Sequence, residues 1–122
     1  MNVAVIGASN HHEKFGNKAV RAYLAHGHSV YPVNLREDRI EGLTAYRSIE
    51  DVPVKLDVTL VYVPPEVTLR LLPSIARKGP GDLYLNPGSE DDLVVAKAKQ
   101  LGLEPILACS ILAIGDRPSN YR

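Results

Sequence analysis

The sequence predicts a doubly wound α/β domain built on a five-stranded parallel sheet. Short apolar runs alternate with amphipathic segments along the whole chain, which is the pattern of strands joined by crossover helices. The first run, residues 2–6, is apolar almost throughout, as in strands that are buried on both faces of a parallel sheet. At 122 residues the chain has room for one domain, so we assign residues 1–122 to a single domain.

Five apolar runs of strand length follow one another along the chain. We expect strands over residues 2–6, 29–33, 58–63, 82–85 and 104–108. The second run is closed by Asn34, and the third is stopped by Pro64 and Pro65, because proline has no N–H to offer a sheet. The segment between these two runs is polar and irregular.

Helices are expected over residues 15–26, 48–51, 66–78 and 89–101. The first ends before Gly27, since glycine accepts the left-handed backbone that follows many helices. Pro73 lies inside the third and predicts a kink or two shorter pieces, because proline removes a helical hydrogen bond. Ser89 is the expected N-cap of the fourth, and the acidic residues after it suit the positive end of the helix dipole.

The expected strand order is 3-2-1-4-5, a Rossmann-like arrangement in which the winding reverses between the first and fourth strands. Ligands of such sheets bind beyond the carboxyl ends of the strands, at the point of reversal. The loops that should form the site therefore cover residues 7–14, 34–39, 63–66 and 86–89.

Composition excludes several classes of function. Fourteen basic and fourteen acidic residues give a formal net charge of zero, which argues against binding to nucleic acid or to an anionic membrane surface. Cys109 is the only cysteine, so neither an intramolecular disulfide nor a Cys-rich zinc site can form. The N-terminus lacks the basic region of a signal peptide, and no apolar stretch approaches the roughly 20 residues of a membrane span. We expect a soluble cytoplasmic protein.

The first loop has the features of a phosphate-binding loop. Gly7 directly follows a buried strand, which lets the chain turn tightly and lets a phosphate approach the backbone. Ser9 and Asn10 can donate hydrogen bonds, Lys14 can add a positive charge, and the next helix begins with free amides. The loop matches neither G-x-G-x-x-G nor the Walker pattern, so its placement predicts phosphate binding, with a plain polar loop as the alternative.

The second loop discriminates among nucleotides. A NAD-binding sheet carries an acidic residue at the end of its second strand, where it holds the ribose 2′-hydroxyl. Asn34 occupies that place here, and Arg36 follows it. Because a guanidinium grips phosphate bidentately, this end favours a ligand with a phosphate on its ribose, such as NADP or coenzyme A (CoA). The alternative is a solvated loop in which Arg36 and Arg39 pair with Glu37 and Asp38.

Five segments of the chain together resemble the CoA-binding family. In order they are VAVIGASNHHEKFGNKAV, VYPVNLRED, VYVPPE, NPGSEDD and an apolar strand that ends in Cys109. Members of this family are small single-domain proteins with the fold of the CoA-binding segment of succinyl-CoA synthetase alpha subunits. The resemblance covers residues 2–114 and implies a CoA site at the carboxyl ends of the strands.

The residues expected to bind CoA come from four strand ends. They are Gly7, Ala8, Ser9, Asn10, Lys14, Asn34, Arg36, Val63, Pro64, Asn86, Pro87 and Gly88. The resemblance implies that the first loop surrounds the pyrophosphate and that Val63 and Pro64 line the adenosine–pantetheine path. Arg36 stands where the family usually has a lysine, so the positive charge is kept. Leu35 replaces a proline, and residues 83–86 lack the tryptophan and glutamine of many relatives.

Other reactive side chains give no catalytic or metal site. His11 and His12 are adjacent, so their side chains point apart, and a structural metal site needs about four converging ligands. Cys109 is expected to behave as a small hydrophobic residue, and the alternative is a thiol that faces the thiol end of CoA. The phosphorylated histidine of the synthetase lies beyond the matching region, so the resemblance implies no catalytic residue here.

We therefore expect non-catalytic binding of CoA or an acyl-CoA. One alternative is an NAD(P)-binding domain that acts with a partner enzyme, and another is an interaction module whose pocket is vestigial. A homo-oligomer or a partner protein is left open. Residues 115–122 are expected to form a polar tail that is loose or packs on a partner subunit.

Overall fold

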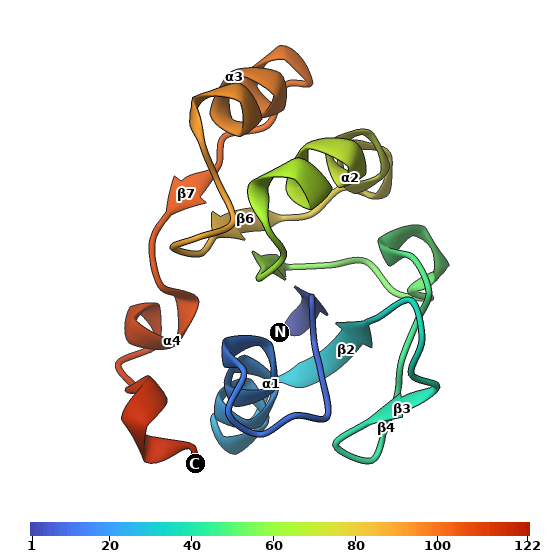
Figure 1. The fold of residues 1–122 in the computed structure, drawn as a ribbon. Coiled ribbons are helices and arrows are strands. Elements are labelled where there is room, and N and C mark those ends of the chain that lie inside the picture. The colour runs from blue at the N-terminus through green and yellow to red at the C-terminus, as the bar shows by residue number, and fades with distance from the viewer.

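Five parallel strands form one sheet at the centre of the protein (Figure 1). The computed structural model describes all 122 residues. The strands follow the order β2-β1-β5-β6-β7, and every pairing is parallel. They are β1 (Asn2–Ile6), β2 (Ser29–Val33), β5 (Val58–Val61), β6 (Asp82–Leu85) and β7 (Ile106–Leu107). The predicted α/β class with a five-stranded parallel sheet is confirmed.

Helices cover both faces of this sheet (Figure 1). One face carries α1 (Phe15–Ala25), α4 (Ser110–Ala113) and the short helix η2 (Pro118–Asn120). The opposite face carries α2 (Pro65–Lys78), α3 (Asp92–Gln100) and the short helix η1 (Ile49–Asp51). None of these helices combines the length and the apolar character that crossing a membrane requires.

The side chains of β1 point alternately into two separate cores. Val3 and Val5 pack with the residues of α1 and α4, whereas Ala4 and Ile6 pack with those of α2 and α3. All four residues are buried. A strand enclosed between two helical layers needs apolar side chains on both faces, which explains the apolar run at the start of the sequence.

The strand order differs from the expected one in a single place. The third strand along the chain, β5, pairs directly with β1 instead of lying beyond β2. The physical reason is Pro32, which has no N–H for a second partner strand and so suits β2 to the edge of the sheet. Beyond that edge the chain makes only an isolated bridge, from Val33 to Tyr46. The winding therefore reverses between β1 and β5.

Two helix expectations need correction. Helix α2 runs as one helix through Pro73, so it is not divided into two shorter pieces; Leu72 and Ile75, on either side of the proline, are fully buried in the core. The N-cap of α3 is Asp91, whose carboxylate accepts a hydrogen bond from the amide of Val94 at 2.9 Å. Ser89, the expected N-cap, is buried in the preceding turn and donates to the carbonyl of Asn86.

The polar segment after β2 contains a small hairpin that the sequence pattern did not predict. Its strands are β3 (Arg39–Ile40) and β4 (Leu43–Thr44), which pair antiparallel. They are joined at Glu41 and Gly42, both of which have a positive φ. Such two-residue turns are typical of hairpins, but glutamate is an unusual residue for the first position.

The last residues of the chain lie against α1. Tyr121 donates a hydrogen bond to Asp116, and its ring lies 5.7 Å from the guanidinium carbon of Arg21. Arg21 also donates to the carbonyl oxygen of Arg122 at 3.0 Å. These contacts attach the polar tail to its own chain.

Candidate nucleotide-binding site

A cavity of about 640 Å³ opens at the carboxyl ends of the strands, beside the reversal between β1 and β5. Ten of the twelve residues expected from the sequence line it: Gly7, Ala8, Ser9, Lys14, Asn34, Val63, Pro64, Asn86, Pro87 and Gly88. The sequence argument did not include five others among the binding residues: Phe15, Gly16, Tyr62, Ser89 and Cys109. The segments that follow all five strands of the sheet therefore meet around one hollow, as the carboxyl edge of a parallel sheet requires.

The first loop offers backbone amides to this cavity. Gly7 has a φ of +88°, and a Cβ there would lie 3.0 Å from the carbonyl carbon of Tyr62, so the strand end approaches its neighbour closely. The amides of Ala8 and Ser9 have no hydrogen-bond partner within the chain. The first amides of α1 are also free, and its first turn carries no acidic residue. Free amides at a helix start attract anions.

The two asparagines that line the cavity, Asn34 and Asn86, also hold its loops together through hydrogen bonds. Asn34 donates to the carbonyl oxygen of Ala8 at 2.8 Å, and its own side-chain oxygen accepts from the amides of Arg36 and Glu37. Asn86 is 1% exposed; it donates to the carbonyl oxygen of Val61 and accepts two hydrogen bonds from the residue that begins α4. The side-chain oxygen and one amide N–H of each asparagine are thus already engaged within the protein.

A buried polar network closes the cavity at the side of α4. The hydroxyls of Tyr62 and Ser110 lie 2.6 Å apart, and Tyr23 donates to the carbonyl oxygen of Ser110 at 2.8 Å. Burial raises the pKa of Tyr23 to about 12 and holds the pKa of Tyr62 above its usual range. Both phenols therefore stay neutral near pH 7. Cys109 lies beside this network and lines the cavity, half-buried.

Asn10, which the sequence placed in the site, lines neither this cavity nor the neighbouring one. Its side chain turns to the hairpin, where it donates to the carbonyl oxygen of Arg39 at 2.9 Å and accepts from the amide of Glu41. The carboxylate of Glu41 in turn contacts His12 and the buried side chain of Asn17. The hairpin and the first loop are thereby fastened together, and Asn10 acts as a support.

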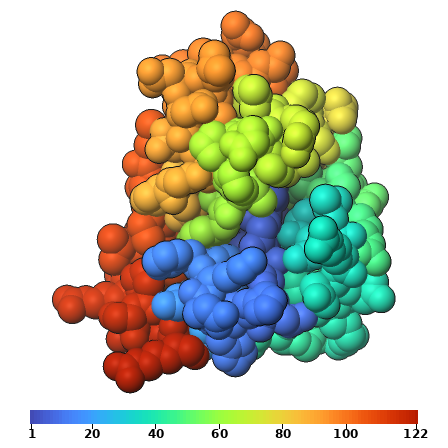
Figure 2. All heavy atoms as spheres, in the orientation of Figure 1, coloured from blue at the N-terminus to red at the C-terminus, as the bar shows by residue number.

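A second cavity of about 360 Å³ adjoins the first and shares Gly7, Asn34 and Val63 with it. In Figure 2 atoms near β1 are visible in the depth of a hollow between α2 and the segment after β2. Arg36, the remaining expected residue, lines this second cavity together with Arg47, which the sequence argument did not single out. The remaining lining is mainly apolar, with Ile49, Val67 and Leu71 among its residues.

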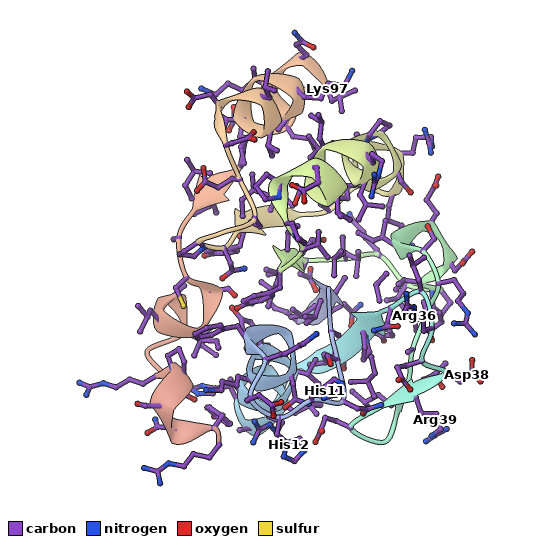
Figure 3. The ribbon with its side chains drawn as sticks, in the orientation of Figure 1. His11, His12, Arg36, Asp38, Arg39 and Lys97 are labelled. Carbon is purple, nitrogen blue, oxygen red and sulfur yellow. The ribbon has the colours of Figure 1, made fainter.

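Neither cavity is lined by a histidine, an aspartate or a glutamate. Imidazole and carboxylate groups, the usual general acids and bases, are thus absent from both linings. His11 and His12 lie on the first loop outside the cavities (Figure 3). His12 contacts Glu41 at 3.1 Å, and no group of three or more His, Cys, Asp or Glu side chains is placed to hold a metal ion. The arrangement is suited to holding an anionic ligand.

Comparison with known proteins identifies the family of the chain. The family model described as the CoA binding domain matches residues 1–115. The chain belongs to this CoA-binding family. The match includes the first loop, the segments that line both cavities and the strand that leads to Cys109.

Curated relatives of this CoA-binding domain include much longer ligases. The alpha subunit of ADP-forming acetate–CoA ligase II from Pyrococcus furiosus is 36% identical over 78 residues, 63% of this chain and 17% of that protein. The ADP-forming acetate–CoA ligase of Methanocaldococcus jannaschii is 32% identical over 78 residues, 64% of this chain and 11% of that protein. The chain therefore spans less than a fifth of the length of these relatives.

Solved structures contain the same fold both as a separate chain and as part of a larger one. A conserved hypothetical protein from Pyrococcus furiosus matches with a TM-score of 0.84 and 32% identity, over 92% of this chain and 97% of that one. The dinucleotide-forming acetyl-coenzyme A synthetase 1 of Ca. Korarchaeum cryptofilum, in its apo form, matches with a TM-score of 0.72 and 28% identity. That match covers 86% of this chain and 25% of the synthetase.

Proposed function

We propose that this CoA-binding domain holds CoA or an acyl-CoA across its two adjoining cavities and performs no chemical step of its own. One observation carries the proposal: the two cavities meet at Gly7, Asn34 and Val63, and each offers a different chemistry. CoA likewise has a phosphorylated nucleoside at one end and a thiol-bearing arm at the other, with a pyrophosphate between them.

In this proposal the pyrophosphate lies over the first loop. The free amides of Ala8 and Ser9 and the start of α1 take its oxygens, and Lys14 adds a positive charge. The phosphorylated adenosine occupies the second cavity, whose apolar wall accepts the base. Arg36 binds the ribose phosphate there.

The pantetheine arm extends along the first cavity, past Val63 and Pro64, toward Asn86 and Cys109. No residue is proposed as a general acid or base, because no imidazole or carboxylate lines either cavity. The hydroxyl of Tyr62 is bonded to Ser110, and burial raises its pKa, so it is a poor base at neutral pH.

Ligand-dependent melting of the purified protein tests the proposal. CoA, acetyl-CoA, dephospho-CoA, NADP, NAD and FMN are compared, since a ligand that binds only the folded state raises the melting temperature with its concentration relative to Kd. We expect CoA to give a larger shift than NAD and FMN. A larger shift with NADP than with CoA would favour the dinucleotide alternative, and no shift with any ligand would refute binding at this site.

Arg36→Glu tests the ribose-phosphate contact. The variant should lower the affinity for CoA more than the affinity for dephospho-CoA, because only CoA carries that phosphate. Arg70→Glu is the matched control: it makes the same charge change at an exposed position of α2 outside both cavities. Equal losses of affinity for CoA and dephospho-CoA would show that Arg36 does not bind the ribose phosphate.

A further inference from the structure

The second cavity is lined by two arginines that reach it from different segments. Arg36 follows β2, and Arg47 follows the hairpin strand β4. Arg36 forms no ion pair in the structure, whereas Arg47 donates through Nη2 to the carboxylate of Asp38 at 2.7 Å. In Figure 3 Arg36 and Asp38 lie on the same side of the protein, along the segment after β2.

A second hydrogen bond keeps Arg47 beside the cavity. Its Nη1 donates to the carbonyl oxygen of Leu35, the residue directly before Arg36. The guanidinium is therefore held by one nitrogen at the cavity rim while its other nitrogen faces Asp38. The carboxylate of Asp38 is 87% exposed and makes no other hydrogen bond in the structure.

An exposed ion pair of this kind is weak, because water solvates both partners and salt screens their attraction. A phosphate monoester carries more charge than one carboxylate and can accept two parallel hydrogen bonds from a guanidinium. A ribose phosphate bound beside Arg36 would therefore compete well for Arg47.

We propose that Arg47 is a second recognition residue for the ribose phosphate, and that Asp38 competes with that phosphate for the Arg47 guanidinium. This inference rests on the proposed function, since it names a specificity residue of the same site. It assigns Asp38 the opposite effect to Arg47: the carboxylate lowers affinity for the phosphorylated ligand and leaves its dephosphorylated form unaffected.

Calorimetric titration of CoA and dephospho-CoA into matched variants tests both parts. Arg47→Gln should lower the affinity for CoA about tenfold and change the affinity for dephospho-CoA by less than about twofold, as expected for the loss of one charge-assisted contact. Asp38→Asn should strengthen CoA a few-fold without strengthening dephospho-CoA. In a protein that already carries Arg47→Gln, adding Asp38→Asn should raise CoA affinity much less than it does in the wild type, because the two residues act on one interaction.

Glu37→Gln is the control for a general electrostatic effect. It removes a neighbouring negative charge that does not pair with Arg47. We expect it to change CoA affinity less than Asp38→Asn does. An equal gain from both variants, or a gain from Asp38→Asn that persists without Arg47, would overturn the competition.

The failure of the inference can be distinguished from the failure of the proposed function. If the wild-type protein binds neither ligand, the proposed function is wrong and the inference fails with it. If the wild type binds CoA and Arg47→Gln weakens both ligands equally, only the inference fails. Should Arg47→Gln not fold, Asp38→Asn still decides the matter, because Asp38 is exposed and an unchanged CoA affinity would contradict the competition.

Discussion

Gly16 lies so close to Gly7 that a Cβ at position 16 would be 2.1 Å from the carbonyl oxygen of Gly7. The first turn of α1 therefore rests directly on the end of β1, with no room for a side chain between them. This contact brings the free amides of the helix start next to those of the first loop. It is the closest counterpart in this protein of the glycine that allows tight helix–strand packing in dinucleotide-binding sheets.

Gly16→Ala should destabilise the protein by about 3 kcal/mol or more, because the backbone on one side must move to admit the methyl group. It should also abolish nucleotide-dependent stabilisation, since the amides of the loop and the helix would separate. Chemical unfolding and the ligand-dependent melting shift measure the two effects. Gly27→Ala is the control: its φ is +83° but its Cβ would meet nothing within 4 Å, so we expect a loss of about 1 kcal/mol with ligand binding retained. Normal binding by folded Gly16→Ala would contradict this role.

Asn10→Ala should loosen the hairpin of β3 and β4 while affecting CoA only indirectly. The substitution removes the hydrogen bonds to Arg39 and Glu41, and each such contact contributes about 1 kcal/mol. Hydrogen exchange should therefore quicken at residues 39–44. Asn10→Asp keeps the oxygen that accepts from Glu41 but sets a carboxylate oxygen against the carbonyl oxygen of Arg39 and the carboxylate of Glu37, so it should quicken exchange at least as much. If CoA binding fell while exchange in the hairpin stayed unchanged, Asn10 would be a ligand contact after all.

Tyr23 makes stability depend on alkaline pH. Burial raises its pKa to about 12 from 10.0, so between these values the unfolded state releases a proton that the folded state keeps. Its contribution is fully present below pH 10 and is lost as the pH rises toward 12, at up to about 1.4 kcal/mol per pH unit.

Tyr23→Phe should flatten the fall in unfolding free energy above pH 10, although it loses the hydrogen bond to Ser110 and is less stable at pH 7. Urea unfolding at several pH values gives the slope. Tyr31→Phe, at a half-buried position outside this network, serves as the control and should keep the wild-type slope. An unchanged slope in Tyr23→Phe would show that its phenol ionises alike in both states.

Asp116 fastens the C-terminal tail. Hydrogen bonds from Tyr121, Asn120 and the amide of Arg117 hold the pKa of its carboxyl well below the usual range. The ionised carboxylate therefore stabilises the folded tail at pH values above the ordinary aspartate pKa near 3.8. This contribution to stability is lost as the pH falls further below that value.

Asp116→Ala should therefore quicken hydrogen exchange and proteolysis at residues 117–122 at pH 7. The sheet should be unaffected, because the tail packs chiefly on α1. Asp51→Ala, at an exposed position of η1, is the control. Full protection of the tail in Asp116→Ala would show that the contacts of Arg21 hold it without the carboxylate.

The strands and the first loop could be predicted from local sequence because their causes are local. A buried strand needs an apolar run, and residues 2–6, 29–33 and 82–85 have the predicted bounds. The position of β2 at the sheet edge could also have been predicted, since Pro32 lacks the N–H that an inner strand uses. The expected strand order did not take Pro32 into account.

The roles of polar side chains could not be predicted in the same way. Asn10, Asn34 and Asn86 have the same chemistry in sequence as free ligand donors, yet all three are hydrogen-bonded within the protein. Which partner each amide finds depends on segments 24 to 31 positions away along the chain.

The sequence by itself determined the α/β class, the five strand segments of the central sheet, a glycine-led loop after the first strand and the absence of net charge, because these follow from periodicity, composition and residue type. Only the tertiary structure decided that β5 lies against β1, that two cavities meet at Gly7, and that Arg47 joins Arg36 in one of them. The physical reason is that a site at the edge of a parallel sheet is assembled from strand ends far apart in the chain, and their neighbours are fixed by packing.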